Sequence, residues 1–240
     1  MPDPRDRLII ALDVSSASEA RKIASAIGDA ASIFKVGKQL FTAEGPQVVR
    51  DLVASGRKVF LDLKFHDIPN TVGGAVRLAS ELGVSMLTVH AAGGSKMLRA
   101  ASDAAQRGSK PLLLAVTVLT SLSDTDLQET GVSGRVIDQT LRLAALARSA
   151  GCGGVVCSAQ ETGELRRELG TGFAIVNPGI RPTGTPTDDQ SRVVTPAEAI
   201  AAGASHIVVG RPITAAADPS AAARSIIDQI ARAQALTPVA

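Results

Sequence analysis

Acidic and basic side chains alternate at the end of one apolar run. The run KVFLDLKF (58–65) contains Asp62 and Lys64, and His66 and Asp67 follow it directly. Successive side chains of a strand point to opposite sides. One side carries Phe60, Asp62, Lys64 and His66, and the other carries Leu61, Leu63 and Phe65. If the apolar side packs on helices, the charged side faces inward, where charges are costly unless they are paired or functional.

Two earlier apolar runs add charges of the same kind. In LIIALDV (8–14), Asp13 lies on the same side as Ile9 and Ala11. In SIFKVGK (32–38), Lys35 lies on the same side as Gly37. All of these charges lie toward the carboxyl ends of their runs. A buried ion-pair network is the structural alternative. Because three neighbouring runs contribute together, a functional site is favoured.

Alternating lysines and carboxylates suit one kind of chemistry. Carboxylates beside a lysine favour its charged form. A protonated lysine is a poor nucleophile for a Schiff base, but it can donate a proton and stabilise a developing carbanion. The pattern therefore predicts a reaction that places negative charge on carbon and then protonates it. Metal binding by Asp62, His66 and Asp67 is the competing interpretation, and the ammonium of Lys64 between them disfavours it.

Strand and helix signals alternate along the 240 residues. Strands are expected at 8–14, 32–38, 58–65, 86–91, 112–119, 154–159, 173–179 and 206–213. Stretches with helical spacing, such as 141–151 and 222–236, lie between or after them. This alternation is typical of the α/β class with a parallel sheet. Eight units predict a single (β/α)8 TIM barrel over residues 1–240, whose active site lies at the carboxyl ends of the strands.

A phosphate site is predicted after the eighth run. VVGRPI (208–213) contains Gly210, which allows close backbone approach, and Arg211, which can hold a phosphate with two hydrogen bonds. Loops after strands seven and eight commonly bind phosphate in this fold. The polar segment at about 181–192 has no helix or strand signal. Long loops in compact domains are often functional, so we expect a mobile lid there.

Composition narrows the class of protein. The net charge is +2, the basic residues are scattered, and Trp and Tyr are absent, which disfavours a nucleic-acid partner. No apolar run approaches the ~20 residues of a membrane span, and the charged start MPDPRDR resembles no secretory signal. We expect a cytoplasmic protein in which Cys152 and Cys157 stay reduced.

At DLKFHDIPNT (62–71) the sequence resembles the bacterial branch of the orotidine 5'-phosphate decarboxylase family. Supporting motifs, in family order across nearly the whole chain, are ALDV (11–14), FKVG (34–37), VLTS (118–121), PGIRP (178–182), DQSRVVTP (189–196) and VVGRP (208–212). The resemblance implies a cofactor-free lyase that removes CO2 from orotidine 5'-phosphate (OMP) to give UMP in pyrimidine biosynthesis. It also implies a homodimer with shared active sites.

The resemblance assigns roles to particular residues. A Lys-Asp-Lys-Asp array is catalytic in that family, and its matches are Lys35, Asp62, Lys64 and Asp67. Lys64 would protonate C6 of the pyrimidine, and no metal is implied. The implied substrate contacts, of which Ile68 and Thr71 cross from the second subunit together with Asp67, are Asp13, Lys35, Ile68, Thr71, Thr120, Arg181, Gln190, Gly210 and Arg211.

Strand parity bears on the shared site. Asp67 lies three residues after Lys64, so ideal alternation points it away from Lys64. A two-fold dimer could instead deliver Asp67 to the partner's pocket. Two other functions stay open: a metal-dependent sugar-phosphate decarboxylase or aldolase, and a barrel that binds a nucleotide without catalysis. His66 and His206 are expected to be structural, and the side on which His90 lies is left open.

Overall fold

Eight parallel strands close into a barrel in the computed structural model, which describes residues 3–182 and 194–236. In chain order around the barrel, they are β1 (Leu8–Ala11), β2 (Ile33–Gly37), β3 (Lys58–Phe65), β4 (Met86–His90), β5 (Leu112–Val116), β6 (Gly154–Val156), β7 (Ala174–Asn177) and β8 (His206–Val209). The predicted (β/α)8 barrel is confirmed, and each expected run contains one strand.

The strands end earlier than several of the expected runs. The eighth expected run, 206–213, is wrong beyond Val209, because its last part forms the helix α10 (Arg211–Thr214). Pro212 explains the change, since proline lacks the N–H that a strand ladder needs and suits the first turn of a helix. The site motif at 210–211 therefore sits at a strand-to-helix turn rather than inside a strand.

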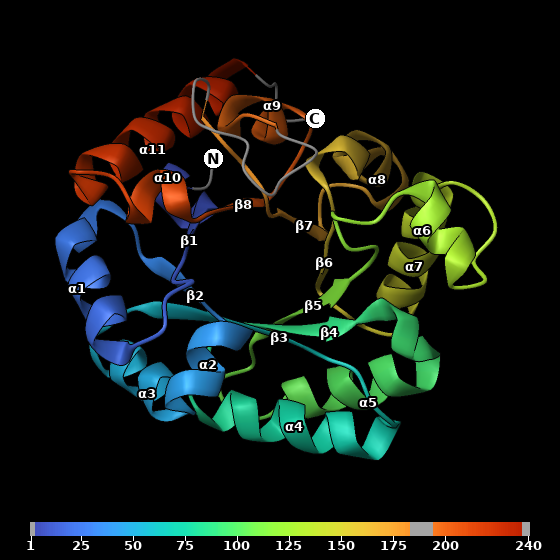
Figure 1. Ribbon diagram of the computed structural model, residues 1–240. Helices are drawn as coiled ribbons and strands as arrows, with labels where there is room; N and C mark the ends of the chain where they lie inside the picture. The colour runs from blue at the N-terminus through green and yellow to red at the C-terminus, as the bar shows by residue number, and fades with distance from the viewer. Residues whose placement is uncertain (1–2, 183–193, 237–240) are drawn as a thin grey trace.

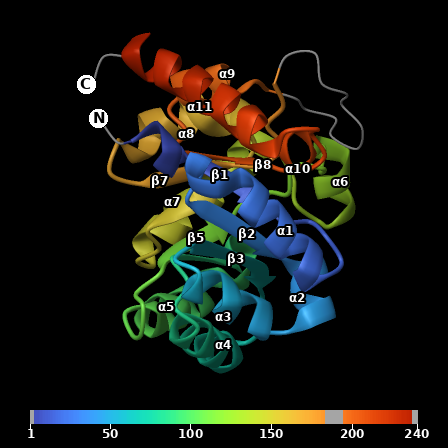
Figure 2. The ribbon, with the colours of Figure 1, turned by 90° about the vertical axis from the view of Figure 1, so that its left-hand side faces the viewer.

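Helices form a ring around the strands (Figure 1). They are α1 (Ala17–Ile27), α2 (Lys38–Glu44), α3 (Gln47–Ala54), α4 (Pro69–Glu81), α5 (Gly94–Ala105), α6 (Asp124–Glu129), α7 (Val136–Ser149), α8 (Thr162–Leu169), α9 (Pro196–Ala201), α10 and α11 (Pro219–Leu236). Four short 3-10 helices are η1 (Pro4–Arg7), η2 (Gly28–Ala30), η3 (Ala91–Gly93) and η4 (Ala159–Glu161). In Figure 2, α2, α6 and α10 gather at one end of the barrel. Because α2 and α10 directly follow β2 and β8, the carboxyl ends of the strands meet at this end.

Apolar side chains fill two separate layers. The barrel interior contains Ile9, Ala11, Ile33 and Phe60 with residues from the other strands. The layer between strands and helices contains the alternate residues, among them Ile10, Phe34 and Leu61. The inner and outer sides predicted for the first three strands are therefore confirmed.

The pairing of neighbouring strands places the site residues in rows. Ala11 of β1 pairs with Lys35 of β2, and Lys35 pairs with Phe60 of β3. Two residues nearer the carboxyl end, which is the next position on the same side, Gly37 of β2 pairs with Asp62 of β3. The β3–β4 ladder is irregular between the pairs Leu61–Leu87 and Phe65–Val89. Three residues of β3, 62 to 64, therefore lie opposite the single β4 residue at position 88.

Both cysteines are buried and free. Burial raises the pKa of the Cys152 thiol to about 12 and raises that of Cys157 as well. Such thiols are poor nucleophiles. None of the helices in the described part of the chain is both long and apolar enough to span a membrane.

Candidate active site

Four charged side chains form a chain of contacts at the carboxyl ends of β1, β2 and β3. Lys35 Nζ lies 2.8 Å from Asp13 Oδ1 and 4.0 Å from Asp62 Oδ2, and Lys64 Nζ lies 2.8 Å from Asp62 Oδ2. The side chains of Lys35 and Asp62 are only 11% and 13% exposed, whereas that of Lys64 is 25% exposed. The structure thus brings together the four charges that the sequence placed on inner sides, with the ammonium of Lys64 accessible to a ligand.

Gly37 makes room for this array. Lys35 lies two residues before Gly37 on the same side of β2, and Gly37 pairs with Asp62. The side chain of Lys35 must therefore pass Gly37 toward the carboxyl end of the barrel to meet the carboxylates. A Cβ atom on Gly37 would lie 2.9 Å from Lys35 Nζ and 3.2 Å from Asp13 Oδ1. The missing side chain therefore leaves the space in which the ammonium sits. Sequence reasoning placed Gly37 on the inner side but did not identify this requirement.

Lys64 has an unusual backbone conformation. Its φ is +53°, in the left-handed region that costs a residue with a side chain about 1–2 kcal/mol. It lies in the irregular stretch of β3, and its backbone N–H donates a hydrogen bond to Thr88 Oγ1 at 2.9 Å. The Thr88 hydroxyl donates to Asp62 Oδ1, also at 2.9 Å. Sequence reasoning missed Thr88: the alternation of β4 gives it the same side as Met86, but only the irregular pairing of β3 and β4 brings it to Lys64.

A pocket of about 470 Å³ opens beside the array. Its other lining residues come from β1, from the segment after β7 and from β8 and α10: Ala11, Pro178, Gly179, Ile180, Arg181, Val208, Gly210, Arg211 and Thr214. The predicted phosphate residues Gly210 and Arg211 therefore line the same pocket as Lys64. Arg181 adds a second guanidinium group to the residues of this pocket.

The predicted lid falls largely outside the described residues. Arg181 and Pro182 are described, whereas the rest of 181–192, including Gln190, is not. On the two sides of the undescribed segment, the backbone N–H of Arg181 donates to the Val194 carbonyl at 3.1 Å. These two sides are therefore fixed to each other next to the pocket.

Four predicted site residues do not line this pocket. Asp67, Ile68 and Thr71 are exposed, and Asp67 Oδ1 accepts a hydrogen bond from the backbone N–H of Ile68 at 2.6 Å. Thr120 is half-buried in the turn after β5. Within one chain, the array is thus Asp13, Lys35, Asp62 and Lys64, without Asp67.

The three histidines lie in different environments. His66 is exposed beyond the end of β3, and its ring centroid is 5.5 Å from that of His90. Burial, followed by the charges of His66 and Lys64, lowers the pKa of His90. At the opposite end of the barrel, burial and the nearby Arg7 lower the pKa of His206 to about 4. His206 thus lies on the face expected to serve stability.

The competing metal interpretation lacks a ligand cluster. Among residues 3–182 and 194–236, no three His, Cys, Asp or Glu side chains are grouped so as to hold a metal ion. Asp62 contacts lysines, whereas His66 contacts His90 and Asp67 bonds to the backbone. The described geometry favours proton transfer over metal ligation at these residues.

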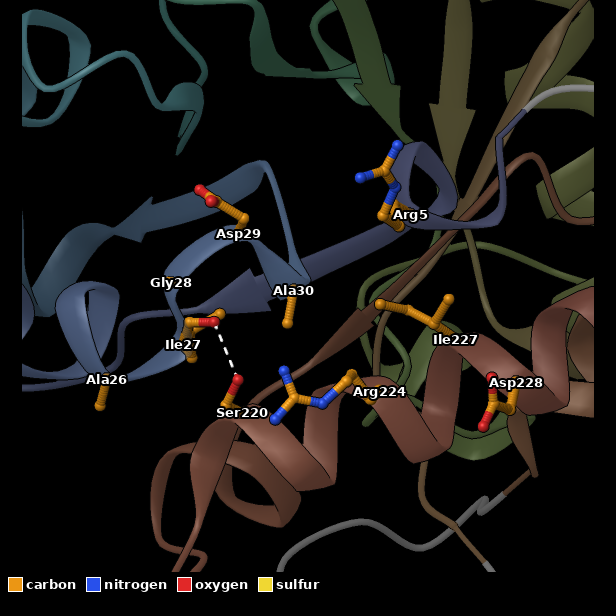
Figure 3. A pocket seen from close by; sticks show the side chains of 10 residues that line it. All are labelled: Arg5, Ala26, Ile27, Gly28, Asp29, Ala30, Ser220, Arg224, Ile227 and Asp228. Carbon is orange, nitrogen blue, oxygen red and sulfur yellow. Dashed lines mark hydrogen bonds between the residues drawn. The ribbon is translucent and has the colours of Figure 1, made fainter.

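A larger groove lies away from the array. It measures about 580 Å³ and lies between α11 and the η1 and η2 turns. Figure 3 shows that the side chains of Asp29, Arg224 and Asp228 do not converge on a common point, and that Ser220 Oγ donates to the Ile27 carbonyl. Size alone therefore does not locate the active site; the grouped charges do.

Fold and site together define a class of protein. A parallel barrel with a lysine–carboxylate array and two arginines around one pocket at the carboxyl ends of its strands is typical of a barrel enzyme acting on a phosphorylated substrate. Residues 6–226 match the model of the "Orotidine 5'-phosphate decarboxylase / HUMPS family". The chain belongs to this family, which confirms the resemblance seen in the sequence.

Known proteins of similar sequence and structure carry the same description. The orotidine 5'-phosphate decarboxylase of Idiomarina loihiensis is 51% identical over 225 residues, 93% of this chain and 97% of that protein. The one from Alkalilimnicola ehrlichii is 54% identical over 217 residues, 90% of this chain and 92% of that protein. The crystal structure of orotidine 5'-phosphate decarboxylase from Lactobacillus acidophilus has a TM-score of 0.85 and 42% identity, covering 94% of this chain and 99% of that one. The expectation that this chain is an enzyme of the same kind is confirmed.

Proposed function

We propose that the protein decarboxylates OMP to UMP in pyrimidine biosynthesis, through a carbanion at C6 that Lys64 protonates. The observation that carries the proposal is the position of the Lys64 ammonium. It lies 2.8 Å from Asp62 in a pocket that also contains Gly210 and Arg211. A donor held beside a carboxylate, within reach of a site for an anionic phosphate, fits this chemistry. The names of the relatives support the choice of substrate.

The proposed reaction needs only groups of the protein. The bond between C6 and the carboxylate carbon breaks, CO2 leaves, and the electron pair stays on C6. Lys64 Nζ then gives one of its protons to C6 and regains a proton from water. The charged lysine stabilises the carbanion as it forms, because an ammonium in a partly buried site interacts more strongly than in water. We propose that the reaction uses no cofactor and no metal.

Substrate binding is proposed to divide between the two ends of the pocket. The family resemblance assigns the ribose hydroxyls to Asp13 and Lys35, whose ion pair lies at the carboxyl ends of β1 and β2. Gly210, Arg211 and Arg181 would surround the phosphate, since a guanidinium can hold it with two hydrogen bonds. The resemblance also assigns the pyrimidine edge to Thr120 and a phosphate contact to Gln190, which lies outside the described residues.

The test is the loss of OMP absorbance on addition of purified protein, with and without EDTA, with UMP measured as the product. Equal turnover in both conditions is expected. Activity lost with EDTA and restored by a divalent metal would favour a metal-dependent decarboxylase or aldolase. Tight UMP binding without turnover of OMP would favour a nucleotide-binding barrel and reject the proposal.

We also infer a homodimer in which each pocket is completed by the partner. Asp67, Ile68 and Thr71 are exposed at the end of β3 and the start of α4, and Ile68 is 66% exposed. A single exposed apolar side chain is common on protein surfaces, so the inference rests on the family resemblance and on the absence of these three residues from the pocket lining of their own chain. A two-fold contact repeats on both subunits, so the same segment would enter both pockets.

Mixed dimers test the shared site. Under conditions that exchange subunits, inactive Lys64→Ala and Asp67→Ala chains should regain activity, because one site of each hybrid carries both defects and the other none. A mixture of Lys64→Ala with Asp62→Ala is the matched control and should stay inactive, since both residues serve the pocket of their own chain. Verified hybrids of the first pair without recovered activity would reject the shared site.

The cellular setting is inferred from the same residues. We infer a cytoplasmic enzyme without a nucleic-acid partner, because the net charge is +2 and the two buried thiols are free. Fractionation of cells, with enzyme activity followed in each fraction, tests the compartment.

A further inference from the structure

One buried hydroxyl contacts both groups on which the proposed reaction depends. Thr88 on β4 has no exposed surface. Its Oγ1 accepts a hydrogen bond from the backbone N–H of Lys64 and donates one to Asp62 Oδ1, each at 2.9 Å. A hydroxyl has one proton and two lone pairs. These two bonds therefore fix the direction in which the Thr88 hydroxyl points.

The place of Thr88 follows from the irregular ladder. Leu61 pairs with Leu87 and Phe65 pairs with Val89, so β4 offers one residue opposite three of β3. In such a bulged stretch the backbone loses regular ladder partners, and a buried donor without a partner is costly. The side chain of Thr88 supplies the acceptor for the N–H of Lys64 that a regular ladder would take from a neighbouring carbonyl.

The same bond restrains the side chain that would deliver the proton. Lys64 has a φ of +53°, which side-chain sterics disfavour. Its Nζ lies 2.9 and 2.8 Å from the two carboxylate oxygens of Asp62. Thr88 therefore fixes Lys64 at its backbone and fixes the carboxylate that holds the other end of its side chain. An apolar residue at position 88 would do neither.

We propose that Thr88 is a positioning residue for the decarboxylation, which aims the Lys64 ammonium at the reacting carbon by holding the Lys64 backbone and the Asp62 carboxylate. The inference rests on the proposed function, since it takes Lys64 as the proton donor. Thr88 does not line the pocket. It acts through Lys64 and Asp62 and not by touching the substrate.

Removing the hydroxyl at nearly constant shape tests the proposal. Thr88→Val should lower kcat on OMP about 10- to 100-fold, the size expected when a reacting group is misplaced by a fraction of an ångström to an ångström. KM for OMP and the affinity for UMP should change much less, because the groups proposed to hold ribose and phosphate stay in place. Thr88→Ser keeps the hydroxyl and should restore most of kcat. A merely structural threonine would show neither the kcat–KM split nor the rescue.

Thr117 provides the matched control. Its side chain is also buried, and its hydroxyl donates to the Val156 carbonyl at 3.0 Å, away from the array. Thr117→Val should lower the thermal midpoint Tm, as loss of one buried hydrogen bond does, and keep kcat. If Thr88→Val keeps the kcat of the wild type, or loses no more than Thr117→Val, the inference is wrong.

Two further experiments distinguish a failure of this inference from a folding defect and from a failure of the proposed function. If Thr88→Val does not fold, Thr88→Cys replaces it, because a thiol of similar size is a much weaker hydrogen-bonding group; normal kcat in Thr88→Cys overturns the inference. Wild-type protein that does not decarboxylate OMP, or a fully active Lys64→Ala variant, overturns the proposed function and this inference together. With those two results as expected, unchanged kcat at position 88 overturns this inference alone.

Discussion

Partly buried cationic side chains have different partners at the two ends of the barrel. At the carboxyl end of the strands, Lys35 and Lys64 contact the carboxylates of Asp13 and Asp62. At the opposite end, arginines donate to backbone carbonyls: Arg57 to Gly28 and Ala31, Arg7 to Ala204 and Ser205, and Arg166 to Gly170, Phe173 and Gly203. The first set surrounds a pocket, whereas the second ties together the loops that precede the strands.

The degree of burial does not distinguish the cations that line the pocket from those that bind loop carbonyls. Arg166 and Lys64 are both partly buried, and burial lowers the pKa of Arg166. The groups that these cations contact do distinguish them. A backbone carbonyl is a fixed, neutral acceptor, so a cation bound to it stabilises the fold. A carboxylate carries charge and can take part in a reaction, so a cation paired with it beside a pocket is a candidate for chemistry.

The largest expected effect concerns the carboxyl end. Lys64→Ala should lower turnover of OMP by at least about 10²–10⁴-fold, the range for a lost general acid. UMP should still bind, because the pocket residues of β8 and α10 are unchanged, and Tm should change little. Steady-state kinetics and UMP titration measure both. Near-normal turnover would place the proton donor elsewhere.

The opposite end should give the reverse result. Arg166→Ala removes donors to the carbonyls of Gly203 and Phe173, at 3.0 and 2.8 Å. The free energy of unfolding should fall by about 2–4 kcal/mol, because several partly buried acceptors lose charged donors, while kcat of the folded protein stays normal. Arg167→Ala, an exposed neighbour on α8, is the control and should cost less than about 0.5 kcal/mol. Denaturant unfolding compares them; lower kcat with normal stability in Arg166→Ala would break the contrast between the two ends.

A third change should affect activity with little effect on stability. Gly37→Ala places a Cβ about 2.9 Å from Lys35 Nζ, and the flexible end of Lys35 can move away. The expected result is a loss of about 10-fold or more in kcat/KM, from displacement of a binding group. Gly163→Ala on α8, where a Cβ meets nothing within 4 Å, should keep kcat/KM and add about 0.5–1 kcal/mol of stability. Unchanged kcat/KM in Gly37→Ala would show that the array tolerates the shift.

The smallest effect is a pH dependence at the end opposite the pocket. The pKa of His206 falls from its ordinary 6.5 to about 4 in the folded protein, mainly through burial. Below pH 6.5 the unfolded chain therefore binds a proton that the folded chain excludes, so stability is lost as the pH falls from 6.5 toward 4. His206→Gln should remove this part of the loss, on the order of 1 kcal/mol or about 2–4 °C in Tm. Tm curves of wild type and variant that stay parallel between pH 7.5 and 4.5 would contradict it.

Local sequence signals predicted the barrel and the four-charge array. The alternation of Asp62 and Lys64 with Leu61 and Leu63 has the period of a strand, and that period alone gave the inner side. The same signal in the first two strands placed Asp13 and Lys35 beside them. The place of Arg211 after the eighth strand predicted a phosphate contact, whereas the role of Arg181 needed the family resemblance, because an isolated arginine in a loop carries no such pattern.

Features that depend on pairing between strands could not be predicted. Thr88 meets Lys64 only because the β3–β4 ladder is irregular, and the chain contains no local mark of that irregularity. The need for Gly37 arises because Lys35 lies two residues before the pair formed by Gly37 and Asp62. Thr120 does not line the described pocket, and the role proposed for Asp67 in a partner's pocket requires a contact between two chains.

The irregular ladder also explains how the barrel accommodates its site. Between Leu61 and Phe65, β3 contains two more residues than β4 does between Leu87 and Val89. Side chains alternate with a period of two, so an even surplus keeps the inner and outer sides of β3 aligned with those of β4. Accordingly, Leu61 and Phe65 both pack toward the helices. A surplus of one would have turned Phe65 into the barrel. The chain thus gains two extra positions at the carboxyl end of β3, in the stretch that carries Asp62 and Lys64, without reversing the inner and outer sides of the strand.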